Sequence, residues 1–212
     1  MPSTSKLDHF SYCRFLTSTE QTWTTDHWRA RDIVRAIKGE TFGGYVELKI
    51  KNTWHTIDAA HPQVAYDWFA DRVAAETSFD SKTTFYLCPI PDSECTVSAA
   101  RPSKTMRLAE ILVARIPALE IWDGIRFRRK MPKSRESNMR NEAVLFEALH
   151  SRSHIPSGCI ILLDDVCTTG AHARAAARTL KRGGAGTVCS MSVARTMLDP
   201  NEQVFGLRVD AL

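Results

Sequence analysis

Residues suited to chemistry are concentrated in one uninterrupted segment, Cys159–His172. It opens with an apolar run, Cys159–Leu163, and two adjacent carboxylates, Asp164 and Asp165, follow directly. Thr168-Thr169-Gly170 comes next and offers hydroxyl groups, unpaired backbone N–H groups and a conformationally permissive glycine at the start of a helix. Such a combination binds anions. The segment therefore predicts a phosphate site beside a pair of carboxylates.

The elements around this segment indicate how it is positioned. Cys159–Leu163 has the uniformly apolar character of a buried parallel strand, and Ala171–Arg182 is an alanine-rich helix that ends at Gly183-Gly184. Thr187–Ala194 is typical of another strand. A strand, a helix and a strand at this spacing indicate a right-handed parallel crossover within an α/β sheet. Ligands of such sheets bind at the carboxyl ends of the strands, where the two carboxylates fall.

Other interpretations of the segment are weaker in context. Adjacent aspartates can be a solvated strand end, and Thr168-Thr169-Gly170 alone can be an ordinary helix cap. A Walker A loop would end in Gly-Lys-Ser/Thr, which this loop lacks. A dinucleotide-binding fingerprint would follow a strand, whereas Gly183–Gly186 follows a helix. The order of strand, two acids and loop favours the phosphate site.

The thirteen residues Ile160–His172 resemble the phosphoribosyl pyrophosphate motif of type I phosphoribosyltransferases, since four apolar residues, two acids, a small interval and Thr-Thr-Gly stand in the family's order. Gly183-Gly184-Ala185 and Ser192–Thr196 extend the resemblance to the ComF-type competence-associated branch, without its N-terminal cysteine cluster. The resemblance implies the type I phosphoribosyltransferase fold, an α/β fold with a central, mostly parallel sheet flanked by helices. It also implies a mixed α/β, hood-like elaboration over residues 1–80 and a phosphoribosyltransferase core over residues 81–212.

The resemblance assigns roles within the main segment. Asp164 and Asp165 would hold the ribose 2- and 3-hydroxyls and act in catalysis, because carboxylates accept hydroxyl protons and favour positive charge at the anomeric carbon. The loop that follows would hold the 5-phosphate. The residues implied in donor binding are Asp164, Asp165, Val166, Cys167, Thr168, Thr169, Gly170, Ala171 and His172. His172 departs from the Thr or Ser usual in the family, which predicts pH-sensitive phosphate binding.

Two further regions resemble parts of the same site. Cys88–Ser93 resembles the family's pyrophosphate loop, for which the implied residues are Pro91, Asp92, Ser93, Arg101 and Lys104. A basic stretch falls where these enzymes carry a flexible flap, and its residues are Arg126, Arg128, Arg129, Lys130, Lys133, Arg135 and Arg140. Taken alone, the first region can be a proline-bent surface loop, and the second a solvated loop or a contact for a nucleic acid backbone.

The function implied by the resemblance is transfer of a phosphoribosyl group from phosphoribosyl pyrophosphate to a nucleobase-like nitrogen acceptor, or the reverse reaction. Mg²⁺ would enter with the donor, and no side chain is expected to bind it directly. The alternative is a non-catalytic phosphoribosyl- or nucleotide-binding regulatory protein linked to DNA uptake, repair or defence. The acceptor is left unidentified, and candidates to line its pocket are Trp54, His55 and His61.

Composition limits these hypotheses. The chain has 212 residues and a net charge of +4, which suits one sizeable core and anionic ligands, small molecules and nucleic acid alike. No apolar run approaches the roughly 20 residues of a membrane span, and the N-terminus lacks signal or transit features. We therefore expect a cytoplasmic protein with no membrane partner, compatible with a homodimer. Six scattered cysteines show no zinc-ligand spacing.

The rest of the chain is expected to mix helices and strands. The helices predicted by apolar spacing are Thr25–Lys38, His61–Thr77, a segment capped by Ser103 that ends before Pro117, and a short one near Asn138–His150. The strands predicted by alternation or β-branched residues are Tyr45–Ile50 and Thr83–Cys88. Trp122–Asn138 has no clear period and predicts a long loop.

Overall fold

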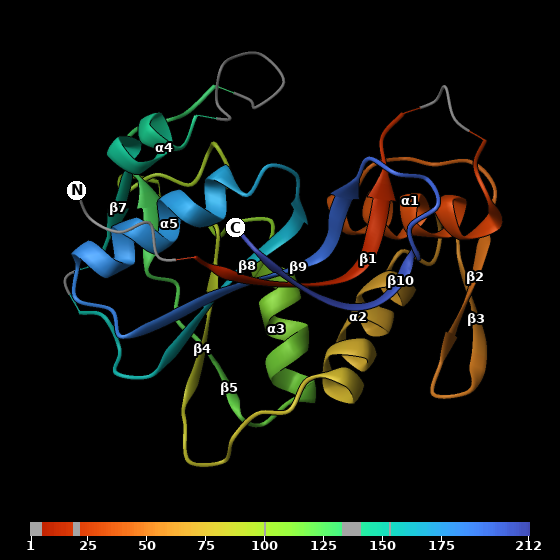
Figure 1. Cartoon of the computed structure of the whole chain (residues 1–212), viewed down its shortest axis with the longest axis horizontal. Helices are drawn as coiled ribbons and strands as arrows, with labels where there is room; N and C mark the ends of the chain where they lie inside the picture. The colour runs from red at the N-terminus through yellow and green to blue at the C-terminus, as the bar shows by residue number, and fades with distance from the viewer. Residues whose placement is uncertain (1–5, 19–21, 100, 133–140, 153) are drawn as a thin grey trace.

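The computed structural model describes residues 6–18, 22–99, 101–132, 141–152 and 154–212. Its centre is a six-stranded sheet in the order β10-β1-β9-β8-β4-β5 (Figure 1). The strands of this sheet are β1 (Asp8–Leu16), β4 (Phe85–Pro89), β5 (Leu119–Ile121), β8 (Cys159–Cys167), β9 (Thr187–Met197) and β10 (Phe205–Ala211). Two antiparallel strand pairs lie outside it. β2 (Val46–Ile50) and β3 (Thr53–Ile57) form a hairpin, and β6 (Ile125–Phe127) pairs with β7 (Leu149–Ser151), a pair called the β6–β7 hairpin below although α4 lies between its strands in sequence.

The central sheet is parallel except at one edge. β5, β4, β8, β9 and β1 pair in parallel, and β10 is antiparallel to β1. The predicted central, mostly parallel sheet is confirmed, and so is the crossover from β8 through a helix to β9. The helices around the sheet are α1 (Thr25–Lys38), α2 (Gln63–Glu76), α3 (Met106–Arg115), α4 (Glu142–Ala148) and α5 (Ala171–Arg182).

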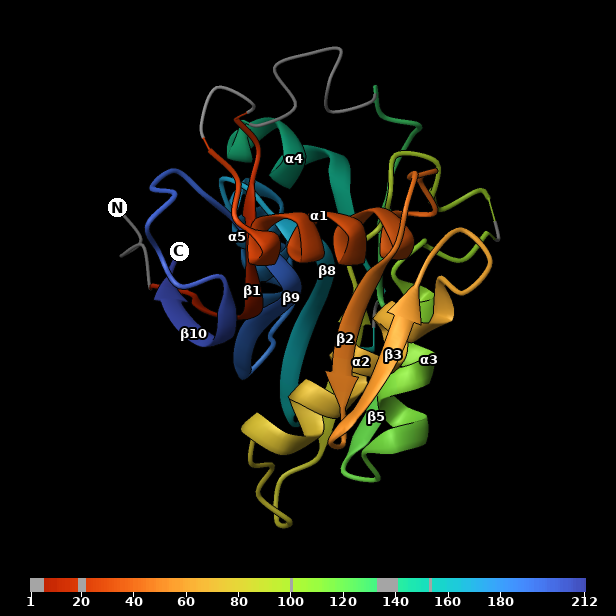
Figure 2. The same cartoon turned by 90° about the vertical axis from the view of Figure 1, so that its right-hand side faces the viewer.

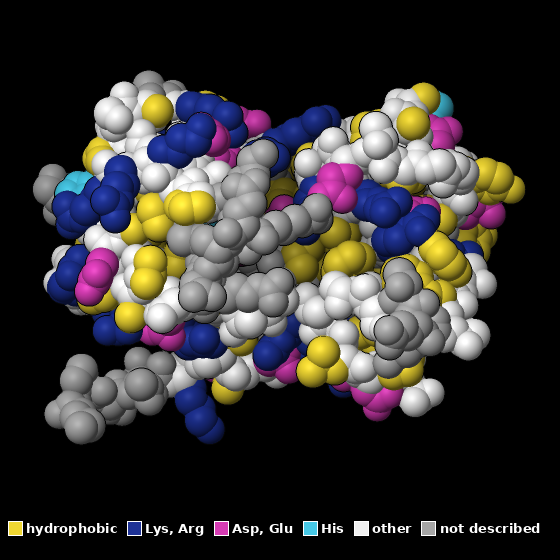
Figure 3. Space-filling model, turned by 90° about the horizontal axis from the view of Figure 1, so that it is seen from above, with side chains coloured by type: hydrophobic (Ala, Val, Ile, Leu, Met, Phe, Trp, Pro, Cys, Tyr) yellow, Lys and Arg dark blue, Asp and Glu magenta, His cyan; other side chains and the backbone are white. Residues whose placement is uncertain are grey.

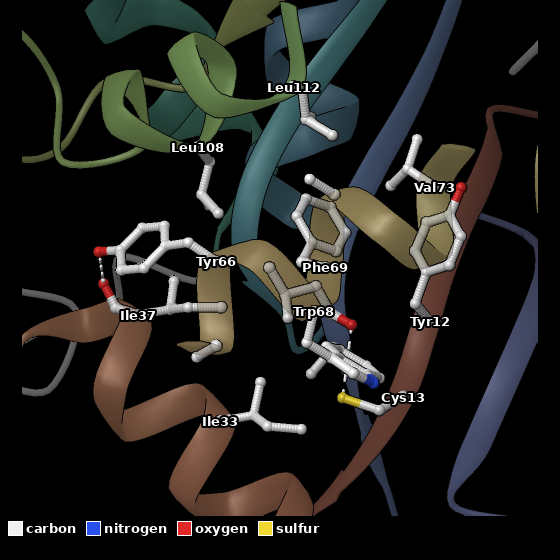
Figure 4. Packing of buried hydrophobic residues seen from close by; sticks show 14 of the residues in the cluster. Tyr12, Cys13, Ile33, Ile37, Tyr66, Trp68, Phe69, Val73, Leu108 and Leu112 are labelled. Carbon is white, nitrogen blue, oxygen red and sulfur yellow. Dashed lines mark hydrogen bonds between the residues drawn. The ribbon is translucent and has the colours of Figure 1, made fainter. Parts of the chain in front are cut away.

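Helices cover both faces of the sheet (Figures 1 and 2). Side chains alternate along β8, so that Ile161 and Leu163 pack with α1, α2 and α3, whereas Ile160 and Leu162 pack with α5 and the β6–β7 hairpin. Figure 4 shows the first of these cores, in which Phe69 of α2 is surrounded by side chains from neighbouring elements. Burial of each such side chain is worth roughly 1.5–3 kcal/mol, so the position of β8 is strongly determined from both sides.

Helix α1 occupies the range that the sequence predicts. Thr24 caps its N-terminus by accepting from the backbone N–H of His27, and Gly39 ends it in the left-handed conformation at φ 68°. The predicted cap of α3 is wrong. The Ser103 hydroxyl hydrogen-bonds to the Thr105 hydroxyl at 2.8 Å, and no side chain caps that helix. Ser103 and Thr105 are both buried and satisfy each other instead.

The strand assignments also differ from the sequence prediction, which does not include β1, β3, β5, β6, β7 or β10. The long loop expected over Trp122–Asn138 contains β6, a strand too short to show a period. Strand β8 continues beyond Leu163 to Cys167, because β9 extends alongside it and pairs with its last residues. Strand β1 is not predicted from the sequence, and its residues join the central sheet between β9 and β10. Residues 8–16 thus belong to the same sheet as the C-terminal strands.

The β2–β3 hairpin is the part of residues 1–80 that stands apart from the central sheet. Figure 2 shows it beside α1 on the side facing the viewer. Within the described ranges, no helix is long and apolar enough to cross a membrane.

Candidate functional site

The two aspartates lie at the carboxyl end of β8, one of the innermost strands of the sheet. β4 pairs with β8 as far as Leu163, and β9 continues past the aspartates, with Asp164 opposite Ser192. Backbone N–H groups turn onto the carboxylates, from Asp165 to Asp164 Oδ1 at 2.9 Å and from Val166 to Asp165 Oδ1 at 2.6 Å. The sheet therefore delivers two adjacent carboxylates to its ligand-binding edge.

Asp164 is in an unfavourable environment for a charge. Burial and the adjacent Asp165 carboxylate raise the pKa of Asp164 well above its usual 3.8, and Lys38 at the end of α1 only partly opposes this effect. A desolvated carboxylate beside a second carboxylate gains free energy from any cationic or hydrogen-bond-donating group placed next to it. A ligand with hydroxyl groups or developing positive charge would therefore stabilise the charged form of these carboxylates.

A tyrosine and an arginine stand near the carboxylates. The Tyr66 hydroxyl of α2 donates to Ile37 O at 2.9 Å, a contact visible in Figure 4. Burial raises the pKa of Tyr66 above its usual 10, and among the nearby charges Arg107 lowers it and Asp165 raises it. The Arg107 guanidinium lies 4.5 Å from the centre of the Tyr66 ring. Sequence reasoning missed Lys38, Tyr66 and Arg107, which come from three helices and form no local motif.

The predicted phosphate loop follows β8 and opens α5. Gly170 adopts the left-handed conformation at φ 73°, which favours glycine, and an added Cβ would lie 2.9 Å from the end of the Leu212 side chain. No side chain caps α5 at its N-cap residue. Thr168 and Thr169 are exposed, and Arg174 donates to Thr169 O at 3.0 Å, which fixes the loop from the helix. A helix N-terminus of this kind attracts anions.

The His172 side chain packs against a neighbouring strand. Its ring packs against Phe127 of β6, with ring centres 5.8 Å apart, and its buried Nε2 has no hydrogen-bond partner among the described residues. Burial lowers the pKa of His172 below its usual 6.5, although Asp165 acts in the opposite direction. The imidazole is therefore neutral near pH 7. The pH-sensitive phosphate binding expected from His172 stays a prediction.

The predicted pyrophosphate loop is internally bonded. The Asp92 carboxylate accepts from the backbone N–H of Glu94 at 2.9 Å and of Lys104 at 3.2 Å, and pairs with Arg101 at 3.2 Å. Although partial burial opposes them, these bonds hold the pKa of Asp92 below its usual 3.8. Pro91 and Ser93 flank Asp92 in this loop, so the structure brings the predicted loop residues together. The charge of Arg101 is already paired within the loop.

Of the predicted flap residues, Arg126 lies in β6 and is paired with Asp123, and the others follow that strand. Arg128, Arg129 and Lys130 are exposed, and Lys130 Nζ lies 2.7 Å from Glu94 Oε1 in the pyrophosphate loop. The Ser93 carbonyl also accepts from the backbone N–H of Met131 at 3.0 Å. The start of the flap is therefore attached to the pyrophosphate loop. The other flap residues named from the sequence, Lys133, Arg135 and Arg140, lie outside the described residues.

Figure 3 looks down on the carboxyl ends of the strands and shows a hollow between two halves of the molecule. Hydrophobic side chains form its visible floor, and basic and acidic side chains stand at its rim.

The aromatic and imidazole residues suggested for an acceptor pocket lie on strand β3 or follow the β2–β3 hairpin. Trp54 packs near Arg29 at 5.8 Å, His61 bonds to Asp58 at 2.8 Å, and His55 is exposed on β3.

The described residues contain no group of three or more His, Cys, Asp or Glu side chains that could hold a metal ion. Two carboxylates remain enough for Mg²⁺, which usually binds one or two protein carboxylates together with substrate phosphates and water. The site thus fits a cation that is carried by a phosphorylated ligand.

No protein-family model and no curated protein matches this chain.

Proposed function

We propose that the chain has the type I phosphoribosyltransferase fold and function, binding phosphoribosyl pyrophosphate and transferring its phosphoribosyl group to, or from, a nucleobase-like nitrogen. One observation carries the proposal. A parallel strand carries two adjacent carboxylates near its carboxyl end, and a glycine-containing loop follows and opens α5, where Gly170 offers no side-chain cap and Thr169 Oγ1 accepts from Ala171 N–H at 3.3 Å. The two halves of this arrangement fit the two ends of a ribose 5-phosphate, its hydroxyls and its phosphate.

Each part of the site has a distinct task in the proposed reaction. Asp164 and Asp165 accept hydrogen bonds from the ribose hydroxyls, while Thr168, Thr169 and the first N–H groups of α5 hold the 5-phosphate. The bond from the anomeric carbon to the diphosphate breaks, the acceptor nitrogen bonds to that carbon, and the proton of the nitrogen leaves to solvent. Positive charge that develops on the ribose would offset the repulsion between the two partly buried carboxylates.

The diphosphate is neutralised from the opposite side of the site. Lys104, Arg128 and Arg129 are exposed basic residues on the pyrophosphate loop and the start of the flap, and Lys130 bridges the two segments. Mg²⁺ bound by the diphosphate would supply further positive charge, with Asp164 and Asp165 as the nearby carboxylates. The protein mainly orients the donor and shields the anomeric carbon from water.

Calorimetric titration of phosphoribosyl pyrophosphate with Mg²⁺ tests the binding half of the proposal. Asp165→Asn keeps the shape of the side chain and removes its charge, and we expect donor binding or turnover to fall roughly 100-fold. Glu120→Gln is the matched control, because Glu120 is exposed on β5 and undergoes the same change. Equal donor affinity in the wild type and the Asp165→Asn variant would remove Asp165 from the site.

The second candidate, a non-catalytic phosphoribosyl- or nucleotide-binding protein that serves DNA uptake, repair or defence, is favoured by a different observation. Arg101 is paired with Asp92, and Lys130 with Glu94, so that charges which would face a diphosphate are partly neutralised by the protein itself. Exchange of labelled pyrophosphate into the donor in the presence of nucleobases distinguishes the two. Tight donor binding without exchange, together with DNA binding that weakens steeply with salt, would favour the second candidate.

A further inference from the structure

A separate cavity lies behind the pyrophosphate loop, between the segment that follows Cys95 and the outer face of the β6–β7 hairpin. Its volume is about 440 Å³, within the range of small-molecule sites. The residues that line it are Thr96, Val97, Ser98, Ala99, Pro102, Asp123, Gly124, Arg126, His150 and Arg152. None of them belongs to the segment Asp164–His172.

Strand alternation explains why this cavity is basic. Ile125, Phe127 and Leu149 point from the hairpin into the hydrophobic core beside α5. Arg126 is directly opposite His150 in the antiparallel register, so their side chains share the other face of the hairpin. Arg152 stands two residues beyond His150, where its backbone N–H donates to Gly124 O at 2.9 Å. The outer face of the hairpin thus carries basic side chains only.

The charges that face the cavity do not cancel. The Arg126 guanidinium makes two contacts with the Asp123 carboxylate, and this pair is neutral as a unit. Neither His150 nor Arg152 has an ion-pair partner among the residues that the structure describes. The facing wall, formed by residues 96–99 and Pro102, carries no charge. Arg152 therefore leaves an unbalanced positive charge at the cavity, with the His150 ring as a further hydrogen-bond donor.

The facing wall has two chemical parts. The hydroxyls of Thr96 and Ser98 lie 3.1 Å apart and form a polar edge, and Ala99 N–H donates to Thr96 Oγ1 at 3.1 Å. Val97 and Pro102 provide apolar surface, and the Val97 side chain is 55% exposed although it is hydrophobic. A ligand that complements both walls has an anionic group that contacts the β6–β7 hairpin and a small apolar or planar group that contacts Val97 and Pro102.

We propose that this cavity binds a phosphorylated small organic molecule, with its phosphate against Arg152 and His150 and its organic part against Val97 and Pro102. A phosphate group suits a guanidinium because paired N–H groups match its oxygens. The proposed site shares no side chain with the carboxylates or the helix N-terminus, and Arg126 is the one residue named for the flap that lines it. Pro102 also lines the cavity, and its neighbours in the chain, Arg101 and Lys104, bond to Asp92, so the cavity adjoins the pyrophosphate loop.

Calorimetry with three probes tests the proposal: phenyl phosphate, inorganic phosphate and phenol. We expect phenyl phosphate to bind most tightly, because it alone offers both an anion and an apolar ring. Arg152→Gln should weaken phenyl phosphate binding at least about tenfold, the usual effect of removing one charged hydrogen-bond donor. Arg208→Gln is the matched control, since Arg208 is exposed on β10 and loses the same charge.

A Thr168→Val variant, changed in the predicted phosphate loop, assigns the binding to one site or the other. Phenyl phosphate binding that Arg152→Gln weakens and Thr168→Val leaves within about twofold supports the cavity, whatever becomes of donor binding. Ala99→Trp, which fills the cavity without changing its charge, should abolish the same binding. Unchanged binding in both the Arg152→Gln and Ala99→Trp variants would overturn the proposal. Phenol binding as tight as that of phenyl phosphate would overturn the role of the phosphate, and inorganic phosphate binding as tightly would overturn that of the apolar wall.

Discussion

The central sheet contains two groups of wholly or partly buried ionisable side chains that are built in opposite ways. At the end of β8, Asp164 and Asp165 lie side by side, and repulsion together with burial raises the pKa of Asp164. The second group, called the edge cluster, lies on β1 beside the edge strand β10. There His9 is 1% exposed, and both of its ring nitrogens are hydrogen-bonded, to Ser190 at 2.9 Å and to Ser192 at 3.1 Å.

The ion pairs beside His9 make the contrast stronger. Asp210 of β10 lies 3.1 Å from Arg14 and 2.7 Å from Arg195, and despite partial burial these guanidinium groups keep its pKa below the usual range. The charges of the edge cluster are thus paired within the protein, although Arg14 Nε and Asp210 Oδ2 lack a well-aligned hydrogen bond, whereas the carboxylates at the end of β8 repel each other. Buried polar groups that lack compensation cost stability and are concentrated where ligands bind.

The largest effect that we expect is a loss of stability at acid pH, caused by His9 in the edge cluster. Burial lowers the pKa of His9 from 6.5 to about 4, with Arg195 and Arg14 contributing and Asp210 opposing. Between these two pH values the unfolded chain binds a proton that the folded protein does not. The free energy of unfolding should therefore fall as pH drops from 6.5 to 4, by about 3 kcal/mol from His9 alone. Urea unfolding at a series of pH values measures it.

His9→Asn removes the titrating group and should flatten this part of the pH profile. Part of the slope should remain, because burial lowers the pKa of His172 in the same direction. His55→Asn is the control, since His55 is exposed on β3, and its profile should match the wild type. A slope unaffected by His9→Asn would show that the edge cluster does not govern acid stability.

Removal of the shared carboxylate in the edge cluster should have the next largest effect. Asp210→Asn leaves Arg14, with 9% of its side chain exposed, and Arg195 without their counter-charge. Loss of one partner of a fully buried ion pair costs roughly 3–5 kcal/mol, and the partial exposure of Asp210 reduces this to about 2 kcal/mol. Chemical denaturation at pH 7 measures the difference. Glu120→Gln, the same change on an exposed residue, should leave stability within about 0.5 kcal/mol.

Asp164→Asn should raise the free energy of unfolding, in contrast to Asp210→Asn, and this tests the comparison most directly. The raised pKa of Asp164 means that the folded state binds more protons than the unfolded state above pH 3.8, so its contribution to stability declines as pH rises through that window. The amide variant avoids this loss and should be more stable at pH 7, by roughly 1 kcal/mol. Donor binding should weaken in the same variant. A destabilised Asp164→Asn protein would mean that the carboxylate is already compensated.

The same contrast decides how much of the molecule the sequence can predict. Asp164, Asp165 and Thr168-Thr169-Gly170 follow one another along the chain, so the order of the residues alone indicates that they lie together. His9 and Ser190 are 181 residues apart, and only the pairing of β1 with β9 brings them together. Contiguous motifs can be interpreted locally, whereas clusters assembled by sheet topology cannot.

The elements follow the same rule. Helix α1 is predicted with the correct ends because its apolar period and Gly39 are local signals. Strand β1 is missed because it is buried on both faces, and its Asp8–Leu16 segment shows no clean alternation. In the candidate site, Lys38 and Tyr66 approach the carboxylates from α1 and α2 and have no neighbouring motif.

The smallest effect should come from the Glu142 group, whose arginines are more exposed than those of the edge cluster, and it tests whether burial of the guanidinium groups separates the two clusters. Glu142 of α4 accepts from Arg174 at 2.8 Å and Arg178 at 2.9 Å, as many partners as Asp210 has. The Arg178 side chain is 52% exposed, so solvent already compensates these charges. Glu142→Gln should therefore lower the free energy of unfolding by less than about 0.5 kcal/mol, and roughly 1 M salt should remove the difference. A loss as large as that of Asp210→Asn would mean that the number of partners, and not their burial, determines what a charge cluster contributes to this fold.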